Sequence, residues 1–303
     1  MKKKIGIAFL VLTASFGVFF AVVSQPLAIP EQSTFTVDWA RVRQLATADE
    51  QPLPTGLNAL LTAYNEIPSL VVTGDFRFSG HPLPIYAYQI VYPDQTLVID
   101  PVVDHDTAVA ILPTAKGFPE AFGQMQSAMR AARHIALTHE HFDHSAGIPN
   151  SPYLAEILPK LVLTREQLEN DHEMEMATFS PELRAKIQPL DYEDYHRLAP
   201  GVVLIKTGGH TPGSQMVYIQ RADGREFLLI GDLAWHADNY RRPQGHPRFV
   251  HWVGREDGEK MAHILRFLHD LQTAQPEMNL VVAHDGDQMA AYVAAGLIGE
   301  HFH

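Results

Sequence analysis

The sequence Thr-His-Glu-His-Phe-Asp-His at residues 138–144 constrains the function of this chain more than any other stretch. It follows a short apolar run that is typical of the end of a buried β-strand. Imidazole and carboxylate groups together are the ligands of zinc, iron or manganese. Residues two apart in an extended segment point to the same side, so His139 and His141 could bind one metal ion. Asp143 and His144 could reach a second ion, and a polar surface loop is the alternative interpretation.

The composition is that of an ordinary globular protein, with 303 residues, 46% of them hydrophobic and 19% charged. This length is sufficient for one large domain with a sizeable core. The net charge of −12 argues against binding to nucleic acid, which requires a basic face. Because the chain has no cysteine, disulfides and thiolate metal sites are excluded, and any metal must bind to His, Asp and Glu.

The N-terminus has the pattern of a secretory signal peptide. Three lysines at positions 2–4 precede an apolar stretch over residues 5–23, and small residues suited to cleavage precede Gln25. The apolar stretch is also just long enough to span a bilayer, so an uncleaved anchor in the inner membrane is the competing interpretation. In either case we expect an exported protein that is periplasmic, secreted or anchored in the membrane.

The rest of the chain alternates between strand and helix patterns, which suggests one domain of stacked αβ layers. The first strands resemble a meander within an antiparallel or mixed sheet. Residues 171–200 and 237–257 lack periodicity, and long irregular segments of this kind are often functional lids. Strands are predicted over residues 70–73, 85–92, 96–99, 134–137, 161–163, 201–206, 215–220, 226–230 and 280–283, and helices over 38–46, 118–132, 152–158, 164–172, 258–273 and 288–297.

Three more residues of metal-binding type come at or just after the ends of other predicted strands. His210 lies in a turn rich in glycine, and Asp232 and His284 each end a later strand. A carboxylate at the end of a buried strand needs a partner, which could be a metal ion or a salt bridge. With the four candidates in residues 139–144, these three could meet at one sheet edge. Seven such residues are suited to two metal ions that share one carboxylate.

The order and spacing of four motifs resemble the metallo-β-lactamase superfamily. The motifs are Thr-His-Glu-His-Phe-Asp-His at 138–144, Gly-Gly-His-Thr-Pro-Gly-Ser at 208–214, Gly-Asp at 231–232 and Ala-His-Asp at 283–285. The resemblance covers about residues 70–297 and implies an α/β fold, a four-layer αββα sandwich with the metals at one edge. We therefore assign residues 1–28 to a signal peptide or anchor, 29–68 to a linker and approach segment, and 69–303 to the metallo-β-lactamase-like domain.

The resemblance also implies a role for each candidate residue. Two Zn²⁺ ions per chain are expected, although this ligand set also accepts iron or manganese. A hydroxide that bridges the two metals would attack an ester or lactone carbonyl of a small-molecule substrate. Asp143 would be the catalytic proton carrier. The first metal would bind to His139, His141 and His210, the second to Asp143, His144 and His284, and Asp232 would bridge them.

Differences between this sequence and the individual branches of the family narrow the range of expected substrates. The superfamily's true β-lactamases have cysteine or serine where Asp232 stands, so hydrolysis of antibiotics is disfavoured. Ser214 and the short C-terminus disfavour a thioesterase like glyoxalase II, and export and acidic charge disfavour an RNA phosphodiesterase. Lactonases often have tyrosine where Trp235 stands, and Tyr240 or Tyr218 could substitute for it. A binding protein without turnover, the remaining alternative, would not need all seven ligands.

The segment from Trp235 to Arg255 is aromatic and rich in arginine, and we expect it to line the substrate pocket. A solvated surface loop is the alternative interpretation of this segment. The other histidines of the second half, at positions 236, 246, 251, 263 and 269, receive no functional assignment, and the sequence predicts no oligomeric state.

Overall fold

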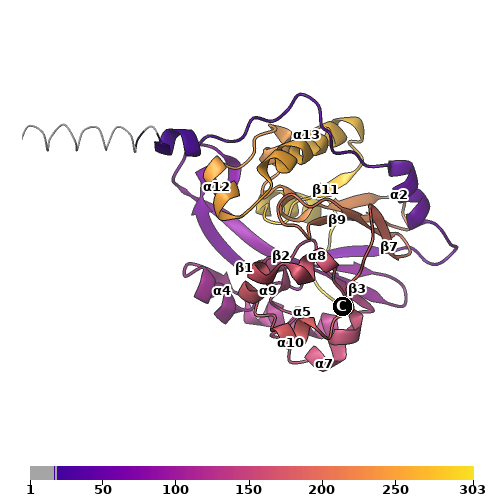
Figure 1. The fold of residues 1–303 in the computed structure, drawn as a ribbon. Helices are drawn as coiled ribbons and strands as arrows, with labels where there is room; N and C mark the ends of the chain where they lie inside the picture. The colour runs from indigo at the N-terminus through magenta and orange to yellow at the C-terminus, as the bar shows by residue number, and fades with distance from the viewer. Residues whose placement is uncertain (1–16, 18) are drawn as a thin grey trace, which may run out of the picture.

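The computed structural model describes residue 17 and residues 19–303, and in these the chain forms two β-sheets packed face to face (Figure 1). Most of the expected signal or anchor segment, residues 1–28, lies outside the described residues. Among the helices of the described part, none is both long and apolar enough to cross a membrane.

The first sheet is mixed, as the sequence predicted. Its six strands run in the order β4-β1-β2-β3-β5-β6, and β1, β2 and β3 are antiparallel neighbours while β3, β5 and β6 are parallel. Its strands are β1 (Gly56–Pro68), β2 (Gly80–Val91), β3 (Thr96–Ile99), β4 (Lys116–Gly117), β5 (His134–Ala136) and β6 (Leu161–Val162).

The second sheet is built from the C-terminal half of the chain. Its five strands run in the order β11-β10-β9-β8-β7, antiparallel except for the parallel pair β10 and β11. Its strands are β7 (Tyr195–Ala199), β8 (Val202–Lys206), β9 (Gln215–Gln220), β10 (Glu226–Leu229) and β11 (Asn279–Val281).

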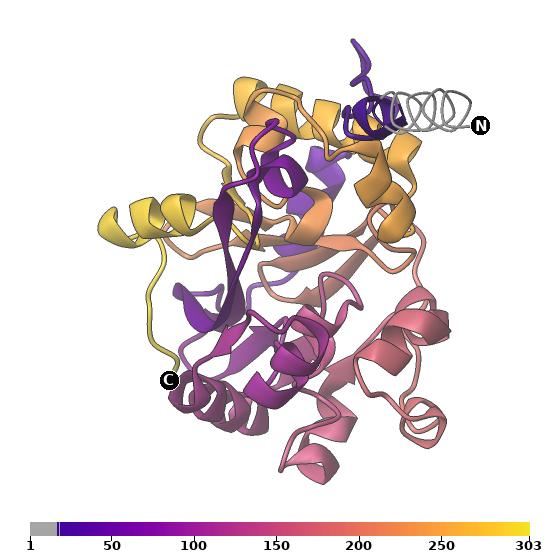
Figure 2. The same ribbon diagram turned by 90° about the vertical axis from the view of Figure 1, so that its left-hand side faces the viewer.

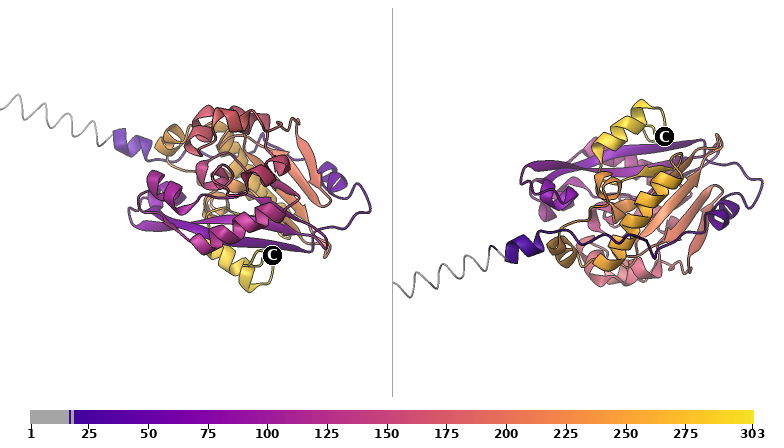
Figure 3. Two further views of the ribbon diagram at one scale, coloured as in Figure 1. Left: turned by 90° about the horizontal axis from the view of Figure 1, so that it is seen from below. Right: turned by 90° about the horizontal axis from the view of Figure 1, so that it is seen from above.

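Helices cover the outer faces of both sheets (Figures 2 and 3). The main helices are α2 (Trp39–Ala46), α4 (His105–Ile111), α5 (Pro119–Ala131), α12 (Arg248–Val253), α13 (Gly258–Ala274) and α14 (Gly286–Ala294). Single turns and short helices complete the set, namely α3 (Ser69–Thr73), α6 (Phe142–Ser145), α7 (Leu154–Ile157), η1 (Leu158–Lys160), α8 (Arg165–Glu169), α9 (Asp171–Met176), α10 (Pro181–Arg184), η2 (Gly231–Leu233) and α11 (Asp238–Arg241).

Three apolar layers hold this arrangement together. Met125 of α5 packs with Ile135 beneath the first sheet. Ile90 of the first sheet and Val217 of the second meet in the layer between the sheets. The apolar stripe of α13, which includes Leu268, covers the outer face of the second sheet. Both faces of each sheet are apolar because both are buried. The result is the four-layer αββα sandwich that the resemblance implied.

Two segments differ from the sequence prediction. Residues 56–68, within the expected linker, form β1, the longest strand of the sheet. Buried and exposed side chains do not alternate along β1, because the strand is covered on both faces. Its sequence therefore lacks the two-residue hydrophobic period of a half-buried strand. Residues 70–73 were predicted as a strand but form the helical turn α3, which buries Leu70 and Val72. This turn ends at Gly74, whose φ of 72° allows the left-handed C-cap.

Candidate metal centre

All seven residues that the sequence nominated lie at the edge where strands of both sheets end. β5 leads into the loop with His139 and His141, and α6 carries Asp143 and His144. His210 follows β8, and the remaining two follow β10 and β11. Their donor atoms form two groups, each within 4.8 Å of one another: His139, His141, His210 and Asp232 in the first group, and Asp143, His144 and His284 in the second.

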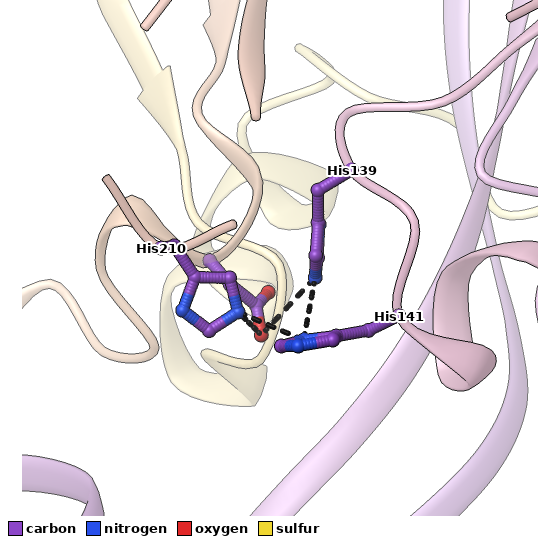
Figure 4. Close-up of side chains that lie close together, drawn as sticks. His139, His141 and His210 are labelled. Carbon is purple, nitrogen blue, oxygen red and sulfur yellow. Dashed lines mark hydrogen bonds and ion pairs between the residues drawn. The ribbon is translucent and has the colours of Figure 1, made fainter. Parts of the chain in front are cut away.

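Three imidazoles converge in the first group (Figure 4). Nδ1 of His141 lies 3.1 Å from Nε2 of His139 and 2.9 Å from Nε2 of His210. Oδ2 of Asp232 completes the group, 3.6 Å from Nε2 of His210 and 3.9 Å from Nε2 of His139. Ring nitrogens this close together, with their lone pairs facing inward, cannot all form hydrogen bonds with one another. A cation between them would coordinate all of these lone pairs.

The second group faces the other oxygen of Asp232. Oδ1 of Asp232 lies 3.2 Å from Nε2 of His144 and 3.1 Å from Nε2 of His284. Oδ2 of Asp143 lies 3.7 Å from Nε2 of His284 and 3.9 Å from Nε2 of His144. Asp232 thus lies between the two groups: Oδ2 faces the first group and also lies 3.2 Å from Nε2 of His284, while Oδ1 faces the second group alone.

A buried aspartate at the end of β3 orients the loop and one of its histidines. Asp100 accepts hydrogen bonds from the backbone N–H of Thr138 at 2.6 Å and from its hydroxyl at 2.7 Å. The same carboxylate accepts from Nδ1 of His144 at 3.0 Å, and the hydroxyl of Thr138 accepts from Nδ1 of His139 at 3.1 Å. With Nδ1 protonated, Nε2 of each ring keeps its lone pair for a metal ion.

Two other histidines are oriented in the same way. Nδ1 of His210 donates to Oε1 of Glu256 at 2.7 Å, and Nδ1 of His284 donates to the carbonyl of Pro84 at 2.7 Å. Glu256 also contacts His251, one of the histidines to which the sequence analysis gave no role. Four of the five histidines are therefore fixed with Nε2 toward the centre, and His141 differs because it presents Nδ1.

The donor set fits divalent cations. Oδ1 of Asp232 is buried and has no hydrogen-bond partner among the described residues, where its ion pairs are formed with histidines alone. Burial acts to raise the pKa of Asp232, but His284, His144 and His139 hold it well below its usual range. A buried anion without a cationic partner is costly. Nitrogen and oxygen donors alone suit zinc, iron or manganese.

The pKa is lowered for two of the five histidines, whereas neighbouring carboxylates raise the pKa of His144, His210 and His284 against the effect of burial. Burial, aided by His144, lowers the pKa of His139 well below its ordinary value. Burial, aided by His210, lowers the pKa of His141 to about 3. Both rings are therefore unprotonated at neutral pH, so neither needs to lose a proton before it binds a metal.

Glu140, between the two histidines of the loop, points away from the centre and connects two motifs. Its buried carboxylate accepts from the hydroxyl of Thr211 at 2.7 Å and from the backbone N–H of Gly213 at 3.2 Å. It also accepts from the amide of Asn170 at 2.8 Å. These bonds fix the loop of His210 against residues 138–144, so Glu140 keeps the three imidazoles of the first group in register.

A cavity of 390 Å³ opens over the two groups, with Asp143 among its lining residues. Most of its wall is apolar and comes from β1, β2, α4, α9 and α12. The wall residues include Ile67, Leu83, Ile111, Met176, Phe249 and Val253. The segment from Trp235 to Arg255 does contribute to this wall, as the sequence predicted, but through its aromatic and aliphatic residues and not through its arginines. The cavity can hold a small molecule with an apolar chain.

Trp235, Tyr240 and Tyr218, the three aromatic candidates for a substrate contact, differ in whether they line the cavity. Tyr240 is fully buried and accepts from Gln288 at 3.1 Å, while the hydroxyl of Tyr218 donates to Glu226 under the second sheet. Neither lines the cavity, so neither substitutes for the family's tyrosine. Trp235 does line it, and among the described residues its buried indole N–H has no hydrogen-bond partner.

Some residues of the centre were missed in the sequence analysis. Asp100 had the same signal that identified Asp232, a carboxylate directly after a buried strand, and it could have been found. Glu256 and Glu173 carried no such signal, because each lies in a segment without periodicity. Glu173 lines the cavity 3.6 Å from Nε2 of His141, and burial raises its pKa.

The chain is similar to known proteins in sequence and in fold. Residues 80–272 match the sequence model of the metallo-beta-lactamase superfamily. Over 111 residues the chain is 31% identical to N-acyl homoserine lactonase AiiA of Bacillus thuringiensis subsp. kurstaki, a match that covers 35% of this chain. The match spans only 40% of the length of that relative.

Solved structures match over more of the chain but at lower identity. An N-acyl homoserine lactone hydrolase with its product bound at the catalytic metal centre superimposes with a TM-score of 0.63 at 16% identity. That match covers 79% of this chain and 96% of the other. AidC, a dizinc quorum-quenching lactonase, gives a TM-score of 0.56 at 13% identity, over 78% of this chain and 90% of its own. At these identities the likeness concerns the fold.

Proposed function

The chain belongs to the metallo-beta-lactamase superfamily, and we propose that it is a dinuclear metal-dependent hydrolase that opens a lactone or cleaves a related carboxylic ester. The observation that carries this proposal is the position of Asp232, whose carboxylate lies between two groups of candidate metal-binding residues. The named lactonase relatives and the apolar cavity support a substrate with an acyl chain.

We assign the ligands as the family resemblance implied. His139, His141 and His210 would hold one ion, Asp143, His144 and His284 would hold the other, and Asp232 would be shared between them. We propose zinc as the resident metal, with iron and manganese as the alternatives. Bound at this centre, the two ions would supply a water molecule of lowered pKa and a Lewis acid for the carbonyl oxygen.

The protein's own residues orient the substrate and move the proton. The apolar wall around Ile111 and Phe249 receives the acyl chain, which places the lactone ring over the metal centre. Asp143 takes the proton from the attacking water as the carbonyl carbon is attacked. The bond from that carbon to the ring oxygen breaks, and Asp143 returns the proton to the departing alkoxide. The product is the ring-opened hydroxy acid.

A substrate panel tests this proposal. The purified protein, reconstituted separately with zinc, manganese and iron, is assayed on N-acyl homoserine lactones, simple esters, a thioester, a phosphodiester and a chromogenic cephalosporin. We expect lactone opening to give the highest kcat/KM, followed by the esters. Faster turnover of the phosphodiester, thioester or cephalosporin would reject the lactone assignment, and no metal-dependent turnover of any substrate would reject the hydrolase itself.

A further inference from the structure

Exposed apolar side chains gather at one end of the molecule, near the mouth of the cavity. The end of α12 contributes Trp252 and Val253, which are 64% and 81% exposed. The loop before β2 contributes Phe76 and Phe78, which are 65% and 62% exposed. We call these four residues the apolar end surface. Among the described residues, the other exposed large apolar side chains are Phe19 and Val22 of the N-terminal helix, and Phe118.

Contacts between distant segments keep this end together. The rings of Phe76 and Phe78 meet edge to face with centroids 5.3 Å apart, and the ring of Phe20 contacts Phe76 at 6.4 Å. The backbone N–H of Arg248, at the start of α12, donates to the carbonyl of Gln25 at 3.0 Å. Figures 1 and 3 show the start of the described chain beside α12 in both views. The N-terminal helix, the loop and α12 thus share one side.

The apolar end surface is continuous with the cavity of the metal centre. Val253 belongs to both, and its neighbours Phe249 and Val250 on α12 line the cavity wall. An apolar patch that adjoins a cavity is unusual on a protein with only water around it, because exposed apolar area has a free-energy cost. The apolar end surface therefore adjoins the cavity wall along α12.

Arginines border the patch on a chain whose net charge is −12. Arg77 and Arg255 are exposed and lie within two residues of the patch in sequence, as does Asp75. Arg242 holds the loop against α11 through ion pairs with Asp75 at 3.2 Å and with Asp238 at 2.9 Å. Arginines at the edge of an apolar surface are attracted to anionic lipid head groups.

We propose that the apolar end surface inserts into the leaflet of an anionic lipid bilayer that faces the protein, with the mouth of the cavity turned toward the membrane. The apolar sequence over residues 5–23 supports this occupant, because its last residues lie on the same side as the patch. The aromatic residues and arginines are those that bind at membrane interfaces. One consequence, which rests on the proposed function, is that acylated substrates reach the cavity from the bilayer.

Quenching of Trp252 fluorescence tests the proposal without any substrate. The full chain is mixed with vesicles of phosphatidylethanolamine and phosphatidylglycerol whose acyl chains carry bromine. We expect Trp252, the exposed tryptophan, to be quenched by the bromine and protected from iodide in the water. The variant Trp252→Phe identifies its share of the signal. The double variant Phe76→Ser/Phe78→Ser should weaken the quenching by about tenfold or more, because two apolar anchors are lost.

The control variant is Phe118→Ser, at the start of α5 and 41% exposed, which should leave the quenching unchanged. Circular dichroism and metal content confirm that each variant is folded. Bound protein whose Trp252 remains open to iodide would show that the N-terminal segment alone holds the membrane, and would overturn the proposal. A dimer detected by sedimentation without vesicles, in which Trp252 is protected from iodide, would assign the surface to a second copy of the chain. That result would also overturn the proposal.

Discussion

Asp143 combines two properties at the scale of a single residue. Its carboxylate belongs to the second group of metal-binding residues, and its side chain is 13% exposed, compared with 4% for Asp232 and 1% for His144. It is therefore the more accessible of the two aspartates of the centre to an incoming substrate and water. That access is what a proton carrier needs, whereas a carboxylate that only holds a metal can be sealed from the cavity.

The substitution Asp143→Ala tests this role. We expect kcat/KM for the best lactone to fall by about 10²–10⁴-fold, the usual contribution of a positioned acid or base. Metal content is measured on the same sample, because loss of a ligand can also release an ion. Asp143→Asn keeps the shape and an oxygen donor and serves as the matched comparison. A variant without the carboxylate that kept both its metals and near-native turnover would refute the assignment.

Trp235 supplies a second prediction at this scale. Its buried indole N–H lines the cavity without a partner, and its ring lies 6.3 Å from that of His210 and 6.4 Å from that of His284. If that N–H donates to the substrate as charge develops on the oxygen, Trp235→Phe should lower kcat by about tenfold with little change in KM. Trp39→Phe, on α2 against Phe267, is the control. A change confined to KM would show that Trp235 only packs against the substrate.

At the scale of elements, the sequence predicted the parts whose local pattern agrees with their environment. The capping box of Thr164 and Gln167 at the start of α8 is present, and the apolar stripe of α13 packs as expected. β1 was missed because its residues are buried on both faces and include many helix formers. The turn α3 was missed because packing outweighed the strand preference of valine. Neither cause can be seen from local periodicity.

The turn around His210 allows a prediction about how loops hold the centre. A Cβ at Gly213 would lie 2.4 Å from Cγ of Gln167 and 2.5 Å from Oε2 of Glu140. Gly213→Ala should therefore cost about 1–3 kcal/mol of unfolding free energy and loosen metal binding, because the loop must move away from Glu140. Gly123→Ala, in α5 with nothing within 4 Å, should be neutral or slightly stabilising. Denaturant unfolding and metal titration measure both, and equal behaviour of the two variants would refute this account.

At the scale of the whole molecule, the metal centre joins the two halves of the sandwich. Residues 139–144 follow a strand of the first sheet, whereas His210, Asp232 and His284 follow strands of the second. The convergence could be predicted from the sequence, because all seven residues come at or just after strand ends. Of the cavity wall, the part from residues 235–255 could be predicted, whereas the rest could not, because it comes from β1, β2, α4 and α9, segments that only the packing of the sheets brings together.

Removal of the metals should therefore destabilise the entire fold. Without the ions, the imidazole lone pairs and the carboxylates of the seven residues are left crowded and buried at the junction of the sheets. We expect chelation to lower the thermal unfolding midpoint by at least about 5 °C, as the loss of a tightly bound ligand does in a domain of this size. Differential scanning calorimetry with and without a chelator measures the shift, and return of zinc should reverse it. An unchanged midpoint, with the metal removed, would contradict this view of the junction.

The most direct test is the number of metal ions that one folded chain binds. The account predicts two divalent ions per chain, measured by elemental analysis on dialysed protein, because the other six candidate ligands form two groups on either side of Asp232. His144→Ala and His139→Ala should each lose one ion first, from different groups. A folded chain that binds a single ion, or none, at saturating zinc would contradict the central claim that Asp232 bridges two metals.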